Sequence, residues 1–133
     1  MITWLLYKFV RFPVSTIRCN GRTLKVFVAD NPARQMLGLM HRQGLRSNEG
    51  MLFIFGNNSK WGIWMANMKF SIDIIWIDRT CTVVDIKKGA EPCNSIFNCK
   101  TFIPKTESKY VLEVNSGGAS RYRIKKGDRL RFR

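Results

Sequence analysis

The sequence of 133 residues has no apolar run of about 18 residues, the length that a membrane-spanning helix needs. Acidic groups are few: nine Asp and Glu stand against 23 Lys and Arg, which gives a formal net charge of +14. The chain has one histidine, and none of its four cysteines forms a Cys-x-x-Cys pair. These absences exclude a spanning helix, a zinc ribbon and a thioredoxin-like redox site, and they predict strongly cationic surfaces.

Catalytic signatures are missing as well. The sequence has no Ser-centred nucleophile elbow, no glycine-rich phosphate loop and no His-Glu-x-x-His motif. The lone His41 lies next to Arg42, whose charge disfavours the protonated imidazole. We therefore expect no enzyme, no metal and no other cofactor, with Glu49 and Asp73 as an alternative acid–base pair.

The hydrophobic fraction of 45% and the aromatic fraction of 12% exclude intrinsic disorder, and the length suits one domain. Some of the apolar character comes from methionine. Thioether sulfur can bind a soft metal such as copper(I), but methionines at apolar spacing more often fill a core. The clustered methionines are Met36, Met40, Met51, Met65 and Met68.

Most of the chain has the pattern of short strands separated by turns. Residues 15–19 and 23–28 flank Asn20-Gly21, a strong hairpin signal because both positions accept a positive φ. Short helices are expected after Asn31-Pro32 and near residues 118–122. Further strands are expected at 51–55, 62–65, 72–78, 81–87, 110–115 and 129–133, with a turn at 56–58. The sequence predicts a mainly β, single-domain antiparallel β-sandwich or barrel-like fold with one or two short helices.

Residues 89–104 are predicted to form a long surface loop that contains Cys93 and Cys99. We expect these two cysteines to be reduced or structural thiols, and a small disulfide ring, which their spacing can close, is the alternative.

The N-terminal residues 1–12 are apolar, but their charges follow the apolar residues, which is the wrong order for a signal peptide. We expect a first strand or an apolar flap over the core. A short amphipathic helix at a membrane surface is the alternative. The resulting expectation is a cytoplasmic monomer, with peripheral membrane association through residues 1–12 left open.

Several blocks of the sequence, in order, resemble the DUF192 family, whose biochemical role is not established. They are Val28-Ala29-Asp30, Gly38-Leu39-Met40 with Arg42, Glu49-Gly50-Met51-Leu52-Phe53, Trp64-Met65 with Asn67, Asp73-Ile74-Ile75-Trp76-Ile77-Asp78, Val111-Leu112-Glu113-Val114 and Gly127-Asp128. The resemblance implies a compact, mostly β domain over residues 14–133, with 1–13 outside it, and no known catalytic set. The chain departs from the family's Trp-Met-Lys-Asn-Thr…Pro-Leu-Asp stretch at Ala66, Met68, Ser71 and Ile72.

Polar and aromatic residues beside apolar strands suggest a ligand-binding cleft. Trp64 could stack on a planar or sugar ring, while Asn67 and Asp73 hold its hydroxyl or amino groups. In the alternative interpretation the carboxylates satisfy backbone amides and Trp64 belongs to the core. The candidate residues are Arg42, Glu49, Trp64, Asn67 and Asp73. We expect a non-catalytic binding or accessory domain for a polar small ligand such as a carbohydrate.

The basic C-terminus supports a second hypothesis, a nucleic-acid-binding domain or a partner of another anionic molecule. Alternation in the last strand places arginines on one face, where they could follow a phosphate backbone, and an aromatic side chain could stack on bases. The candidate residues are Arg121, Tyr122, Arg123, Arg129, Arg131 and Arg133.

Overall fold

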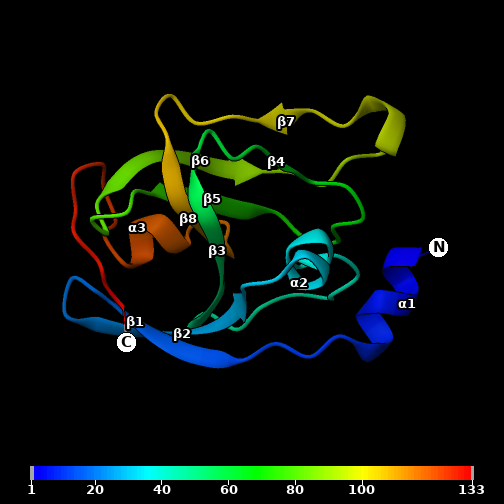
Figure 1. Ribbon diagram of the computed structural model, residues 1–133, viewed down its shortest axis with the longest axis horizontal. Helices are drawn as coiled ribbons and strands as arrows, with labels where there is room; N and C mark the ends of the chain where they lie inside the picture. Colours follow the sequence, from blue (N-terminus) through cyan, green and yellow to red (C-terminus); the bar gives the residue numbers. More distant parts are fainter. Residues whose placement is uncertain (1, 133) are drawn as a thin grey trace.

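The computed structural model describes residues 2–132 and is built on one seven-stranded sheet with the strand order β6-β5-β8-β3-β2-β1-β9 (Figure 1). A separate two-stranded sheet pairs β4 with β7. The elements are α1 (Ile2–Phe9), β1 (Val14–Cys19), β2 (Arg22–Ala29), α2 (Pro32–Leu37), β3 (Glu49–Ser59), β4 (Ile63–Trp64), β5 (Ile72–Ile77), β6 (Val83–Ala90), the 3-10 helix η1 (Ile96–Asn98), β7 (Thr101–Phe102), β8 (Ser108–Asn115), α3 (Gly118–Arg121) and β9 (Arg131–Phe132). The prediction of a mainly β fold is confirmed.

The first hairpin follows from its turn residues. β1 and β2 pair antiparallel from Val14↔Phe27 to Cys19↔Arg22. Asn20 and Gly21 have φ values of 51° and 81°. Such a turn matches the twist of the two strands, because both central residues occupy the left-handed region. The hairpin prediction is confirmed.

The sheet is mixed, whereas the sequence predicted a purely antiparallel arrangement. β2 and β3 run parallel from Lys25↔Glu49 to Ala29↔Phe53. A parallel pair needs a crossover, and the segment with α2 between the two strands supplies it. The described residues also contain three α-helices, one more than the upper limit of the prediction.

Residues 2–9 of the N-terminal segment form a helix, so the expected first strand is wrong, whereas the expected apolar flap over the core is compatible with the way this helix packs. One side of α1 places Leu6 against the buried cluster of Leu37, Met40 and Ala66. The opposite side leaves Phe9 75% exposed. A short segment with apolar residues at both helical and alternating spacings fits either structure, and packing on α2 selects the helix.

Two other boundaries differ from expectation. β3 continues through residues 56–58, where the sequence predicted a turn, and its register with β8 shifts between Ile54 and Ser59. The 89–104 stretch is largely irregular as predicted, although it contains η1 and β7. Within residues 2–132, no helix has the length and apolarity needed to cross a membrane.

The two faces of the sheet carry separate apolar cores. On one face, Leu52, Ile75 and Leu112 pack against α3 and the C-terminal segment. On the other face, Met51 and Ile74 belong to a core that is covered by β4, β7 and the loops around them. Figure 1 shows α1 and α2 gathered at one end of the sheet, away from α3 and the C-terminus. The candidate site lies on the second face, towards α1 and α2.

Candidate functional site

A cavity of about 560 Å³ opens on the sheet face that carries Met51 and Ile74. Four segments of the chain contribute to its wall. They are the start of α1, the C-terminal half of α2 from Gln35, the residues around β4, and Ile96 of η1. Its volume suits a small organic molecule. Ile2, Met36 and Trp64 at its lining are 68%, 57% and 46% exposed, so its mouth is apolar and open to solvent.

Among residues 2–132, one carboxyl group lines this cavity, that of Glu113. Glu113 lies on β8 in register with Met51 of β3 on one side and with Ile74 of β5 on the other. Both neighbours are fully buried, and Glu113 itself is 4% exposed. Paired residues of adjacent strands point to the same face, so the carboxyl lies in the middle of an apolar surface.

Within residues 2–132, no hydrogen bond or ion pair joins the Glu113 carboxyl to another protein group. Burial raises the pKa of Glu113 to about 8, because the charged carboxylate is poorly solvated there. At neutral pH the carboxyl is therefore mostly protonated in the free protein. Buried carboxyl groups without a protein partner are uncommon, which makes Glu113 a candidate ligand-binding group.

Aromatic side chains form one wall of the cavity. The rings of Phe55 and Trp61 are stacked with centroids 4.1 Å apart, and the Phe53 ring follows at 6.1 Å from Phe55. Trp61 is held at its backbone, since the Trp76 indole N–H donates to the Trp61 carbonyl at 2.8 Å. Its own indole N–H donates to the Asn57 carbonyl at 3.1 Å. This wall is therefore fixed before any ligand arrives.

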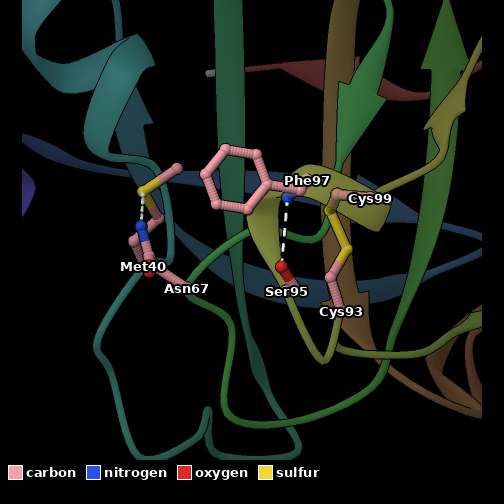
Figure 2. The surroundings of a disulfide bond; sticks show 6 residues. All are labelled: Met40, Asn67, Cys93, Ser95, Phe97 and Cys99. Atoms are coloured by element: carbon pink, nitrogen blue, oxygen red, sulfur yellow. Dashed lines mark hydrogen bonds between the residues drawn. A yellow bond between two sulfur atoms is a disulfide. The ribbon is translucent and has the colours of Figure 1, made fainter.

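Two of the five residues that the sequence suggested for ligand binding line the cavity, Trp64 and Asn67. Asn67 donates from its side-chain nitrogen to the Met40 sulfur at 3.8 Å (Figure 2). Arg42 lies outside the cavity, with its guanidinium 4.5 Å from the Phe27 ring centroid. Together with Phe27 it lines a separate pocket beside the N-terminal segment.

The other two candidates, Glu49 and Asp73, bind backbone amides. Glu49 accepts from the Arg46 N–H at 3.0 Å and lies 3.7 Å from the Lys25 ammonium. Asp73, which is 1% exposed, accepts from three backbone N–H groups. Its donors are Gly89 at 2.9 Å, Gly117 at 3.1 Å and Ala119 at 3.0 Å. The alternative interpretation, in which carboxylates satisfy backbone amides, describes both residues.

Sequence reasoning missed Glu113 as a site residue. The available signal was a carboxylate inside the apolar strand that ends at Asn115, because such a group must be solvated or find a partner. The sequence alone does not show that Glu113 faces a cavity, since that depends on the pairing of β8 with β3 and β5.

α3, which carries Arg121, and the segment with Arg129 and Arg131 lie at the opposite end of the sheet from α1 (Figure 1). Arg131 of β9 lies directly across from Arg18 of β1. The Arg129 guanidinium donates to the Thr80 carbonyl at 3.1 Å. Arg121 and Arg123 are exposed, and Arg133 lies outside the described residues. Arg129 and Arg131 are exposed as well.

Tyr122 cannot serve as a stacking surface for bases in this structure. It is 5% exposed, packs in the core beside α3, and donates from its hydroxyl to the Ser47 carbonyl at 3.4 Å. The proposed aromatic role of Tyr122 is therefore wrong. The physical reason is that α3 turns this residue inward, against the sheet.

Cys93 and Cys99 form a disulfide with their Cα atoms 5.3 Å apart (Figure 2). Within the ring, the Ser95 hydroxyl accepts from the Phe97 N–H at 3.2 Å, and the Phe97 side chain is 94% exposed. Ile96 of the same ring lines the cavity. The disulfide therefore restrains one edge of the cavity mouth.

The structure offers no group of three or more His, Cys, Asp or Glu side chains for a metal ion among residues 2–132. Of the two free cysteines, Cys19 is buried, and burial raises the pKa of its thiol to about 12. A thiol with so high a pKa is a poor nucleophile.

Comparisons with known proteins agree with the fold. A curated relative, UPF0127 protein PYRAB11210 of Pyrococcus abyssi, is 26% identical over 110 residues, which cover 81% of this chain and 86% of the relative. A crystal structure from Sinorhizobium meliloti, described as a candidate transcription regulator, is 31% identical with a TM-score of 0.83 and covers 92% of this chain and 96% of that one. A protein of unknown function from Novosphingobium aromaticivorans is 28% identical with a TM-score of 0.76, over 90% and 84% of the two chains.

The family comparison covers nearly the whole chain. The DUF192 family model, described as an uncharacterized ACR, matches residues 15–132. The match contains the strands that form the sheet and Glu113 at the base of the cavity. The chain belongs to the DUF192 family.

Proposed function

We propose that this chain is a non-catalytic binding domain that holds a small organic molecule in the Glu113 cavity. The observation that carries the proposal is a buried carboxyl without a protein partner at the base of an open, largely apolar cavity. Binding sites for small molecules commonly combine an apolar wall with a few polar groups that fix orientation.

The lining favours a ligand with an apolar body. Besides Glu113, the polar side chains in the lining are Thr3, Gln35 and Asn67, apart from the indole groups. A carbohydrate carries many hydroxyl groups, each of which needs a partner or water when it is buried. An apolar molecule with one polar end fits this surface better than the carbohydrate that the sequence suggested.

Two exposed tryptophans provide a matched test. Trp64 lies at the cavity mouth with 46% exposure, whereas Trp4 lies on α1 outside the lining with 42% exposure. Saturation-transfer NMR with n-hexylamine, 1-hexanol, hexanoate and glucose measures binding to the wild type, Trp64→Ala and Trp4→Ala. We expect binding of probes with a six-carbon chain and no binding of glucose. Trp64→Ala should lower the affinity of these six-carbon probes, and Trp4→Ala should leave it unchanged.

Absence of binding by every six-carbon probe would overturn the proposed function. Equal effects of the two substitutions would also overturn it, because binding would then occur outside the cavity.

A second candidate function is the binding of a polyanion such as a nucleic acid. The observation that favours it is the cross-strand pair of Arg18 and Arg131, since like charges directly opposite one another repel and a phosphate bound between them would relieve that repulsion. Among residues 2–132, neither arginine takes part in an ion pair. The Sinorhizobium meliloti neighbour, described as a candidate transcription regulator, adds support for this candidate.

Fluorescence anisotropy with labelled single- and double-stranded oligonucleotides tests this candidate across a range of salt concentrations. The double variant Arg18→Ala/Arg131→Ala should weaken binding that persists at physiological salt. The control Lys60→Ala/Lys105→Ala removes the same charge from other exposed positions and should have a smaller effect. Equal effects would mean general attraction to a chain of charge +14, and would refute a specific site.

The sequence suggested a cytoplasmic monomer, with membrane association through residues 1–12 as the alternative, and we propose the alternative. The exposed Phe9 and Leu5 of α1 support the alternative. The Cys93–Cys99 disulfide is more typical of an oxidising compartment than of the cytosol.

A further inference from the structure

We infer that the ligand of the Glu113 cavity is an organic cation, an amine with an apolar body whose ammonium group pairs with the Glu113 carboxylate. This inference rests on the proposed function of the cavity and names the chemical class of its ligand.

The charged groups of the cavity lining favour a cationic ligand over an anionic one. The chain contains 23 Lys and Arg, yet among residues 2–132 the cavity lining includes no Lys, Arg or His and one acid, Glu113. Among these described side chains, an anionic ligand would find no cationic partner in the lining and would lie beside an acid. A cationic ligand would find a carboxyl that has no protein partner. Buried charges are stable when they are paired, so the lining selects a cation.

The aromatic wall suits the apolar body of such an amine. Phe55 and Trp61 form a stacked pair in the lining, and the Phe53 ring is stacked on Phe55 beside them. Because the stacked rings cover one another's faces, they offer apolar contact rather than a cation–π site. The apolar body of an amine can pack on the remaining apolar lining, which includes Leu39 and Met40.

Pairing with an ammonium group has a consequence for protons. In the free protein the Glu113 carboxyl keeps its proton at neutral pH, because burial raises its pKa to about 8. The bound state joins R–NH₃⁺ to a carboxylate, so the Glu113 carboxyl releases one proton to solvent when the amine binds. The amine keeps its charge, and the cavity gains no net charge.

This proton release makes amine affinity depend on pH. Below a carboxyl pKa of about 8, each fall of one pH unit should weaken amine binding about tenfold. An uncharged ligand of the same length has no such requirement, so its affinity should stay constant over the same range.

The test compares n-hexylamine, 1-hexanol and hexanoate, which share a six-carbon chain and differ in their polar end. Isothermal titration calorimetry measures their affinities at about pH 6 and about pH 8, for the wild type, Glu113→Gln and the exposed control Glu107→Gln. The amide of Glu113→Gln keeps the size and neutrality of a protonated carboxyl, so this variant should fold. We expect the amine to bind the wild type at pH 8 at least about tenfold more tightly than the other two probes.

We further expect amine affinity for the wild type to rise about 50-fold between pH 6 and 8, and Glu113→Gln to abolish this rise. Glu107→Gln should behave as the wild type. Equal or tighter binding of hexanol, or amine binding without pH dependence, would overturn the inference of a cationic ligand while leaving the cavity as a binding site. Failure of all three probes to bind would overturn the proposed function as well.

Discussion

The buried carboxyl of Glu113 should make the folding stability of this protein fall as the pH rises. In the folded state its pKa is raised from 4.5 to about 8 by burial. The folded protein therefore holds a proton that the unfolded chain releases above its ordinary pKa. The stability contributed by the protonated carboxyl is fully present below about pH 4.5 and is lost as the pH rises through about 8.

The size of this effect follows from the pKa difference. One pKa unit corresponds to about 1.4 kcal/mol, so the free energy of unfolding should fall by about 1.4 kcal/mol per pH unit between pH 5 and 8. The full difference between 4.5 and about 8 corresponds to a loss on the order of 5 kcal/mol. The variant Glu113→Gln cannot titrate and should lose this slope.

Urea denaturation followed by tryptophan fluorescence measures the free energy of unfolding across this pH range. Asp78 and Asp85 do not interfere, because their lowered pKa values place their titration below it. The lowered pKa of His41, caused first by burial, gives a slope of opposite sign, since stability rises with pH where the unfolded chain binds more protons. His41 contributes the same slope to the wild type and to Glu113→Gln. The difference between their free energies of unfolding therefore reports the Glu113 carboxyl alone.

Parallel curves for the wild type and Glu113→Gln would refute this reasoning. They would mean that the carboxyl titrates near its ordinary pKa and that it is solvated or paired in the folded protein.

Two further predictions concern the scaffold around the cavity. Asp73→Asn should lower the free energy of unfolding by about 1–3 kcal/mol, because an amide cannot accept from all three backbone donors and leaves a buried N–H unsatisfied. The exposed Asp30→Asn, which breaks an ion pair with Arg34, should cost less than about 1 kcal/mol in the same urea experiment, and equal costs would contradict this role of Asp73. The double variant Cys93→Ser/Cys99→Ser should lose about 2 kcal/mol through the greater freedom of its unfolded chain. Thermal unfolding without reductant checks this, and an unchanged midpoint would contradict it.

The local turns and caps of this fold are predictable because their signals are short-range. Asn20-Gly21 specifies its hairpin, and Asn31 caps α2 by accepting from the Arg34 N–H at 2.9 Å, with Pro32 in the first turn. These features depend on neighbouring residues alone. The parallel pairing of β2 with β3 depends instead on contacts across a crossover, so the strand patterns do not reveal it.

The candidate site was predictable in part. The sequence identified Trp64 and Asn67, which line the cavity, but grouped them with Asp73, which binds backbone amides on the other face of the sheet. The alternation of β5 places Asp73 and Ile74 on opposite faces, and knowing which face bears the cavity requires the packed structure. Glu113 could not be predicted as a site residue for the same reason, because the sequence does not show which face of the sheet bears the cavity.

A direct measurement of the Glu113 carboxyl tests the central claim that this cavity is the binding site. Carbon-13 NMR of the labelled glutamate side chains, assigned with Glu113→Gln, reports the Glu113 pKa with and without n-hexylamine. We expect a pKa near 8 in the free protein and a marked fall when the amine binds. An ordinary pKa in the free protein, unchanged by saturating amine, would contradict the account.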